Sequence, residues 1–182
     1  MTSRGPWQVL SSEVKYENPW ISVREDKVIH PDGKPGIFGV VTMAAGVTIL
    51  ALDDAGRVYL VELDRYATGT RSFELPGGAI DAGEIPLEAA KRELREEVGL
   101  EATTWTPLGG EFDAYTTTLT CPQRLFLATE LTDVGKVDDP NEPMTIHPVP
   151  LDEAIAMIQD GRITEPFCAT ALLLAARRRL PN

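Results

Sequence analysis

Residues 78–100 of the chain read GAIDAGEIPLEAAKRELREEVGL. The stretch begins with a glycine and ends just past another, and between them an ordered set of glutamates surrounds one arginine. The fixed positions are Gly78, Glu84, Arg92, Glu93, Glu96, Glu97 and Gly99, with apolar Leu94 and Leu100 beside them. At ordinary residue frequencies, so many ordered positions do not recur by chance. The stretch is therefore a motif around which the other segments can be interpreted.

The second half of this motif has the spacing of an amphipathic helix. Pro86 suits the first helical turn, where a missing N–H costs nothing, and Gly99 suits the C-cap. Between them, an apolar stripe recurs every three to four residues at Leu87, Ala90, Leu94 and Val98. The motif thus predicts a helix that buries this stripe and ends at Gly99.

The same spacing places carboxylates together on one face of the helix. Glu93 and Glu97 lie one turn apart with Glu96 beside them, and about 5–6 Å separates side-chain origins at such spacing. Like charges stacked in this way are destabilising unless a counter-charge compensates them. A charge run on a helix is more often a solvated face, but the ordered glycines, Glu84 and Arg92 favour a site for a hard divalent cation.

As a whole, the motif resembles the Nudix box, which it matches without a gap or a substitution. The resemblance implies a metal-dependent diphosphate hydrolase with an α/β fold, an α/β/α sandwich around a mixed sheet. It also implies that Glu93 and Glu97 are the main metal ligands. Glu96 would assist them in metal binding and catalysis, and the backbone carbonyl of Gly77 would face the metal.

The resemblance assigns further catalytic roles. Arg92 would orient the glutamates through ion pairing, and Glu84 would join through a water molecule. The general base is expected on a loop before the penultimate helix, where Glu142 lies in DDPNEPMTIHPVPLDEA. Glu142 could equally be a loop residue that aids solubility, and Glu111 and Glu130 are the alternatives.

Patterns of apolar and polar residues predict strands on both sides of the motif. Before the motif, strands are expected at 20–29, 37–43, 47–54, 57–65 and 73–75; after it, they are expected at 103–115, 124–131 and 146–151. Helical spacing predicts helices at 151–161 and 165–180, and 133–144 is the longest candidate loop. One domain is expected, with 1–45 as a dimer-forming antiparallel strand pair and 46–182 as the catalytic core.

Composition is that of a globular protein, with 43% apolar and 25% charged residues in 182. No apolar run reaches the roughly 18 residues that span a bilayer, and MTSRGPWQVLSSE lacks the apolar core of a secretory signal. A cytoplasmic location is therefore expected. Cys121 and Cys168 are interpreted as reduced core thiols, and His30 and His147 are too scattered for a histidine metal site. The net charge of −11 argues against binding to nucleic acid or to a membrane surface.

The chain is also similar to the Nudix branch that acts on ADP-ribose and other nucleoside diphosphate sugars. In that branch an N-terminal strand pair often crosses to the partner subunit, and its aromatic residues stack on the nucleobase. Trp20 and Phe38 occupy those positions; a stack contributes about 1–3 kcal/mol, although plain strand packing explains both residues equally well. Arg65 matches an arginine that contacts the diphosphate, and Glu74 is a candidate contact for a sugar hydroxyl or water. Both could also be ordinary strand residues.

One position departs from the ADP-ribose pattern. Thr116 and Thr117, in DAYTTTLTCPQRLFLA, stand where a proline–glycine pair is usual. A GDP- or UDP-sugar, such as GDP-mannose, is therefore an alternative to ADP-ribose.

Taken together, these features predict Mg²⁺-dependent hydrolysis of a nucleoside diphosphate sugar to a nucleoside monophosphate and a sugar phosphate, with Mn²⁺ as the alternative metal. One competing interpretation is a pyrophosphatase of nucleoside triphosphates or dinucleotides. Another is a ligand-sensing Nudix module without catalysis, a class that typically lacks box glutamates which this chain has. The expected partners are a nucleoside diphosphate-linked small molecule and a second copy of the chain.

Overall fold

The computed structural model describes residues 2–136 and 143–179. The chain divides into two compact units. The first unit combines residues 1–45 with 113–122, and the second combines 46–112 with 123–182. The N-terminal unit therefore includes the stretch 113–122 in addition to the residues expected for it.

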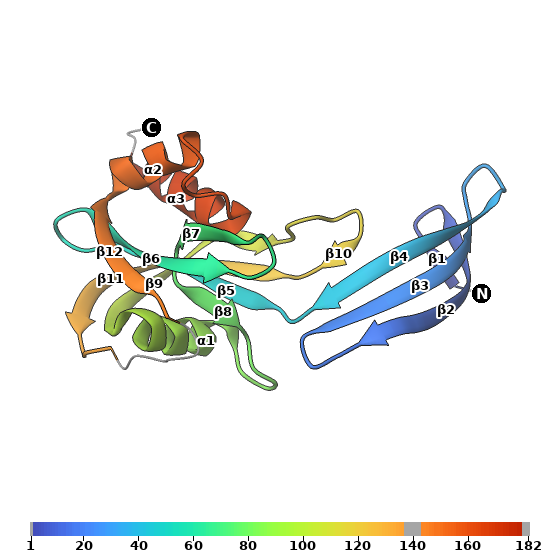
Figure 1. Ribbon diagram of the computed structural model, residues 1–182, viewed down its shortest axis with the longest axis horizontal. Helices are drawn as coiled ribbons and strands as arrows, with labels where there is room; N and C mark the ends of the chain where they lie inside the picture. Colours follow the sequence, from blue (N-terminus) through green and yellow to red (C-terminus); the bar gives the residue numbers. More distant parts are fainter. Residues whose placement is uncertain (1, 137–142, 180–182) are drawn as a thin grey trace. The chain divides into compact units, whose positions relative to one another are not determined.

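A five-stranded sheet forms the first unit, in the order β1-β2-β3-β4-β10 (Figure 1). Its strands are β1 (Thr2–Arg4), β2 (Trp7–Glu17), β3 (Ile21–Ile29), β4 (Pro35–Met43) and β10 (Leu119–Thr120). Neighbouring strands are antiparallel, except that β10 runs parallel to β4. The expected strand pair, β3 and β4, is thus part of a larger sheet because β2 adds a third long strand.

Two sheets form the centre of the second unit. The order of the larger sheet is β8 (Gly77–Ala79), β5 (Gly46–Ala51), β11 (Gln123–Asp133) and β9 (Leu100–Phe112). The smaller sheet has the order β12 (Thr145–Pro150), β6 (Arg57–Arg65) and β7 (Thr70–Glu74). Strands β5 and β11 are parallel and the other pairs are antiparallel, so the larger sheet is mixed as expected.

The described part of the second unit has three α-helices: α1 (Pro86–Glu93), α2 (Leu151–Gln159) and α3 (Pro166–Arg179). The last two confirm the helices predicted at 151–161 and 165–180. Within the described ranges, no helix combines the length and apolar character that crossing a membrane requires.

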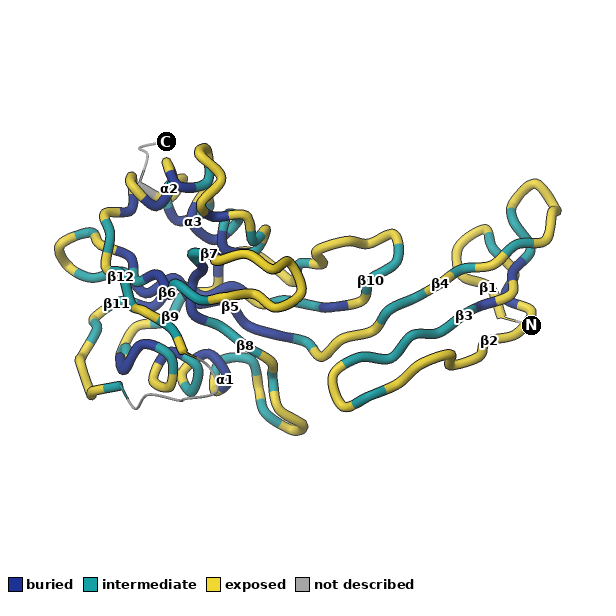
Figure 2. Tube along the Cα trace, in the orientation of Figure 1, coloured by how far each residue is buried: buried dark blue, intermediate teal, exposed yellow. Residues whose placement is uncertain are grey.

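Hydrophobic side chains pack on both faces of the sheets, and Figure 2 shows the buried residues running along β5. Because side chains alternate along a strand, Ile49 packs with α1 on one face while Leu50 packs with α2 and α3 on the other. Both residues are fully buried, and each contributes about 1.5–3 kcal/mol relative to an exposed position. The second unit therefore has the α/β/α arrangement that the sequence predicts.

The motif helix buries the predicted stripe, but its last turn differs from the prediction. Ala90 and Leu94 are fully buried and Val98 is nearly so. The helix continues from α1 as a π-helical turn, η1 (Leu94–Val98), a geometry that is rare and often marks functional sites. Gly99 ends the helix in the left-handed conformation, with φ of 75°, which confirms the predicted glycine cap.

Candidate active site

Strand β8 places two glycines against two glutamates of the motif helix. The backbone N–H of Gly77 donates a 2.8 Å hydrogen bond to Oε2 of Glu97. Gly78 lies so close to Glu93 that a Cβ on the glycine would overlap the Glu93 carboxylate. The glycines at the start of the motif therefore leave the space that the carboxylates near its end occupy.

The backbone of Gly77 is directed away from β5. The neighbouring Pro76 carbonyl accepts a 2.8 Å hydrogen bond from the Ile49 N–H. Because the backbone groups of successive residues in an antiparallel ladder point to alternate sides, the N–H and C=O of Gly77 point away from β5. Because a strand residue directs its N–H and C=O to the same side, the Gly77 carbonyl is directed to the side of Glu97. A Cβ on Gly77 would overlap the Val47 carbonyl oxygen, so this position requires glycine.

Arg92 hydrogen-bonds to three glutamates of the motif. Its Nε and Nη2 donate to the two carboxylate oxygens of Glu84 at 3.1 and 3.0 Å. Nη1 donates to Glu93 at 2.7 Å and to Glu96 at 3.3 Å. Nη2 also donates to the Ala79 carbonyl in β8 at 3.0 Å, so one guanidinium fastens the helix to the strand.

These hydrogen bonds shift the pKa values of both partners. The Arg92 guanidinium is the main cause that lowers the pKa of the Glu84 carboxyl, with a smaller contribution from the Asp81 backbone. Glu84 in turn is the main cause that raises the pKa of Arg92, against the opposing effect of burial. The pair is therefore ionised at neutral pH.

The chemistry of the donor set fits a divalent cation. Among the described residues, no three carboxylate, imidazole or thiol side chains converge into a preformed metal cluster. The Glu93 and Glu97 carboxylates nevertheless meet at β8, on the side to which the Gly77 carbonyl is directed. Oxygen donors of this kind suit hard divalent cations. Binding such an ion would replace part of the contact between Glu93 and Arg92.

Two sequence profiles match the chain. One, described as the NUDIX domain, matches residues 42–166. The chain belongs to the Nudix family. The other profile, described as the nucleoside diphosphate sugar hydrolase N-terminal domain, matches residues 7–41. The motif at 78–100 is therefore the Nudix box, and the enzyme is a Nudix hydrolase.

Relatives cover nearly the whole Nudix chain. It is 35% identical to an ADP-ribose pyrophosphatase of Mycobacterium tuberculosis over 92% of this chain and 82% of that protein. It is 26% identical to CMP-5'-(N-acetyl-N-hydroxy-3-aminopropyl)phosphonate hydrolase of Streptomyces rubellomurinus over 92% of this chain and 81% of that protein. A crystal structure of an ADP compounds hydrolase has a TM-score of 0.83 at 22% identity, covering 98% of this chain and 96% of that chain. The last match shows that the Nudix fold is shared.

An ion pair on the smaller sheet lies within electrostatic reach of the Nudix box. Arg65 donates from Nε and Nη2 to both oxygens of Glu74, at 2.9 and 2.5 Å. Glu74 is buried, whereas 49% of the Arg65 side chain is exposed. The pKa of Arg65 is raised, first by Glu74 and also by the charge of Glu97. The sequence assigned Glu74 to a sugar hydroxyl or water, but in the structure both carboxylate oxygens accept from Arg65.

The two aromatic residues expected at the nucleobase do not come together within one chain. Trp20 lies in the turn between β2 and β3 and is 75% exposed. Phe38 lies in β4, where its ring contacts Trp7 edge-on at a centroid distance of 5.8 Å. In the β3–β4 ladder Phe38 lies opposite Asp26, whereas Ile21, next to Trp20, lies at one end of the ladder, opposite Met43. Within a chain the partner of Phe38 is therefore Trp7.

The structure describes two of the three candidates for the general base. Glu142 lies outside the described residues. Glu111 forms a 3.0 Å ion pair with Arg124 of the adjacent strand. Glu130 accepts hydrogen bonds from two threonine hydroxyls of β9, which lower its pKa. Both described candidates are thus engaged by neighbouring strand residues.

A buried thiol supports the loop that leads into β8, which the sequence did not indicate. The Leu75 N–H donates to Sγ of Cys168 at 3.1 Å, and the Cys168 N–H donates to Glu165 at 2.6 Å. Burial raises the pKa of this thiol. Cys121 and Cys168 are both buried and neither forms a disulfide, which agrees with their interpretation as core thiols. Cys168 therefore links α3 to the backbone two residues before Gly77.

Proposed function

We propose that this Nudix hydrolase cleaves the diphosphate bond of a nucleoside diphosphate sugar, either ADP-ribose or a GDP- or UDP-sugar. The reaction would use Mg²⁺, with Mn²⁺ as the alternative, and would yield a nucleoside monophosphate and a sugar phosphate. The observation that carries the proposal is the meeting of Glu93 and Glu97 with the two glycines of β8. The N-terminal profile match and the similarity to an ADP-ribose pyrophosphatase support the substrate class.

Some residues of the Nudix box would bind the cation, and Arg92 would orient these ligands. Glu93 and Glu97 would bind it, with Glu96 and the Gly77 carbonyl contributing further oxygen donors. A divalent cation, when bound, neutralises phosphate charge and acts as a Lewis acid. Arg92 would keep the carboxylates oriented, because its guanidinium contacts two of them and anchors the helix to β8.

Arg65 would bind the diphosphate. A guanidinium is a planar fork that matches phosphate oxygens, and half of the Arg65 side chain is exposed to solvent. Glu74 would act through Arg65, because its buried carboxylate fixes the orientation of the fork. Glu142 remains the proposed general base, on the resemblance to the family.

We also propose a homodimer through the N-terminal unit. That unit exposes large apolar side chains, which on a monomer would face water. They are Leu10, Val14, Tyr16, Trp20, Ile37, Met43 and Tyr115. Trp20 is available to a nucleobase or a partner subunit at 75% exposure, and Phe38 is the second proposed nucleobase contact. Light scattering after size-exclusion chromatography should give twice the chain mass, and Val14→Asp should shift it toward the monomer. A monomeric wild type would contradict the dimer.

A substrate panel tests the proposed function directly. Initial rates would be compared for ADP-ribose, GDP-mannose, UDP-glucose, NADH, diadenosine polyphosphates and nucleoside triphosphates, each with Mg²⁺, Mn²⁺ or EDTA. We expect the highest kcat/KM for one of the three nucleotide sugars and no turnover in EDTA. A higher kcat/KM for a triphosphate or dinucleotide would overturn the substrate class, and turnover in EDTA would overturn the metal dependence.

A further inference from the structure

Residues 74–77 connect the Arg65–Glu74 ion pair to the proposed cation site at Gly77 and Glu97. Each residue of this segment hydrogen-bonds to a different element of the second unit. The four partners, in the order of the segment, are Arg65 of β6, Cys168 of α3, Ile49 of β5 and Glu97 of η1. Helix α3 thus holds the backbone that carries the Gly77 carbonyl, although it contributes no residue to the Nudix box.

The contact with α3 is made by the backbone of Leu75. This residue is 4% exposed and lies between the end of β7 and the start of β8, outside both strands. Its N–H donates to Sγ of Cys168 at 3.1 Å, so a side chain rather than a strand carbonyl satisfies it. A buried N–H that loses its acceptor is costly, because it has also lost its contact with water. The position of the thiol therefore determines where the Leu75 backbone lies.

Glu165 holds Cys168 at the start of α3. The Glu165 carboxylate accepts the Cys168 N–H at 2.6 Å and its carbonyl accepts the Ala169 N–H at 3.1 Å, as a residue that caps a helix does. Burial first, and then the charge of Glu165, raise the pKa of the Cys168 thiol, so the thiol is protonated at neutral pH. A protonated thiol can donate to Glu165 while its sulfur accepts from Leu75. Glu165 and Cys168 therefore form one hydrogen-bonded chain that ends at the Leu75 backbone.

We infer that Glu165 and Cys168 are positioning residues for the cation site. By fixing Leu75, they keep the Gly77 backbone, two residues later, against Glu97. The inference rests on the proposed function for one point, that the ligand of this site is a divalent cation, and deepens it by adding α3 to the elements that shape the site. The competing explanation is packing alone, since Cys168 is 2% exposed in a hydrophobic cluster with Leu75.

Three substitutions of Cys168 separate hydrogen bonding from packing. Serine keeps a donor and an acceptor, alanine removes both at nearly the same volume, and valine fills the space without either. Mn²⁺ would be titrated into each full-length variant without substrate, with EPR detecting the unbound ion. We expect the Kd for Mn²⁺ to rise about tenfold in Cys168→Ala and Cys168→Val, as for other residues that orient metal ligands, and to stay within about twofold of wild type in Cys168→Ser. Packing alone predicts equal Kd values for the serine and alanine variants.

Amide hydrogen exchange in EDTA tests the same positions without metal. The Leu75 and Gly77 amides should be protected in wild type and in Cys168→Ser, and should exchange about tenfold faster in Cys168→Ala. Glu165→Ala removes the cap of α3 and the partner of the thiol, so it should raise both the exchange rate of Leu75 and the Kd for Mn²⁺ about fivefold. Because Glu165 is only half-buried, this variant decides the question where Cys168→Ala does not fold. Wild-type values of both quantities in Glu165→Ala would overturn the inference.

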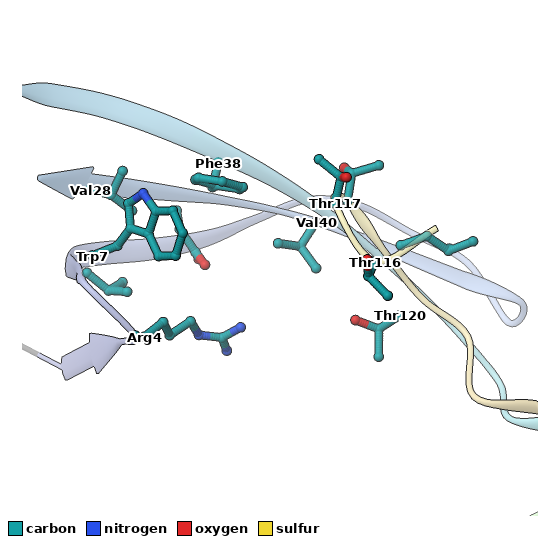
Figure 3. A pocket seen from close by; sticks show the side chains of 13 residues that line it. Arg4, Trp7, Val28, Phe38, Val40, Thr116, Thr117 and Thr120 are labelled. Carbon is teal, nitrogen blue, oxygen red and sulfur yellow. The ribbon is translucent and has the colours of Figure 1, made fainter. Parts of the chain in front are cut away.

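Cys121→Ala is the matched control. Cys121 is the other buried cysteine and belongs to the N-terminal unit, next to Thr120, which lines a pocket of that unit (Figure 3). Its Mn²⁺ affinity and its Leu75 exchange should match those of wild type. The inference is wrong if Cys168→Ala binds Mn²⁺ as tightly as wild type, or if Cys168→Ser binds it as weakly as Cys168→Ala. A wild type that binds no Mn²⁺ would overturn the proposed cation site, whereas exchange in EDTA would still decide whether Cys168 positions Gly77.

Discussion

The Gly77 N–H donates a 2.8 Å hydrogen bond to the Glu97 carboxylate, which lies 20 residues later in the chain. This bond joins strand β8 to the π-helical turn that follows α1. On the adjacent residue, the missing side chain of Gly78 leaves room for the Glu93 carboxylate. The two halves of the Nudix box are therefore one structural unit, in which the glycines determine where the carboxylates lie.

Alanine substitutions of Gly78 and Gly77 should differ in their effects on kcat and on the free energy of unfolding. In Gly78→Ala the new Cβ meets the end of the flexible Glu93 side chain, which can move. The free energy of unfolding should change by less than about 1 kcal/mol, whereas kcat should fall about 100-fold because a carboxylate is misplaced. In Gly77→Ala the Cβ meets the Val47 carbonyl, so stability should also fall, by about 1–3 kcal/mol. Gly110→Ala, with no atom within 4 Å of the new Cβ, is the control. Wild-type kcat in Gly78→Ala would refute the packing argument.

Replacing Arg92 by lysine should weaken the response to metal. The guanidinium donates to three carboxylates and one carbonyl, and an ammonium cannot reproduce that planar set. We expect the Mg²⁺ concentration at half-maximal rate to rise about 10- to 100-fold, as for other residues that orient metal ligands. Arg95→Lys is the matched control, since Arg95 pairs with the exposed Glu101 at 2.9 Å. An equal Mg²⁺ response in both variants would remove Arg92 from this role.

Removing the charge of Glu74 should affect substrate binding through Arg65. Glu74→Gln keeps the shape but not the bidentate ion pair, so the Arg65 fork loses its fixed orientation. KM for the nucleotide sugar should rise about tenfold, and stability should fall by only about 1 kcal/mol because Arg65 can be solvated. Asp53→Asn is the control, because it disrupts a similar carboxylate–arginine pair, with Arg57, elsewhere in the second unit. If Glu74→Gln still raised KM in an Arg65→Ala background, Glu74 would contact the substrate itself.

The Glu84–Arg92 pair predicts a defined pH dependence. Arg92 lowers the folded-state pKa of Glu84 below the unfolded value of about 4.3. A lowered pKa stabilises the fold above the unfolded pKa, and that stabilisation is lost as pH falls through the folded pKa. The stability difference between wild type and Glu84→Gln should therefore shrink only below about pH 4. Carboxyl NMR should show the Glu84 pKa returning upward in Arg92→Gln, and an unchanged value would contradict the assignment.

Local sequence patterns predicted the helices, because a helix depends on residues that are close together in the chain. The apolar stripe of the box helix and its Gly99 cap follow from spacing alone, as do the two C-terminal helices. The π-helical turn could not be anticipated, because the periodicity of Leu94–Val98 fits an α-helix equally well.

The sequence did not predict the side-chain contacts that depend on how the strands pair. Trp20 and Phe38 were predicted as an aromatic pair, yet Phe38 lies opposite Asp26 within the β3–β4 ladder, whereas Trp20 lies just beyond the Ile21–Met43 end. Arg65 and Glu74 were predicted as separate substrate contacts, yet their side chains hydrogen-bond to each other, although the β6–β7 register pairs Arg65 with Thr70 and Glu74 with Val61. Register is set by turns and tertiary packing, which a residue list does not contain.

The most direct test of the central claim is ³¹P NMR of the products formed from ADP-ribose, GDP-mannose and UDP-glucose with Mg²⁺. Wild type and Glu97→Gln would be compared, with Glu88→Gln as the control, because Glu88 is an exposed helix glutamate outside the fixed box positions. Wild type and Glu88→Gln should convert one of these sugars to a nucleoside monophosphate and a sugar phosphate, and Glu97→Gln should be slower by about 1,000-fold or more. Wild-type turnover by Glu97→Gln would contradict the account.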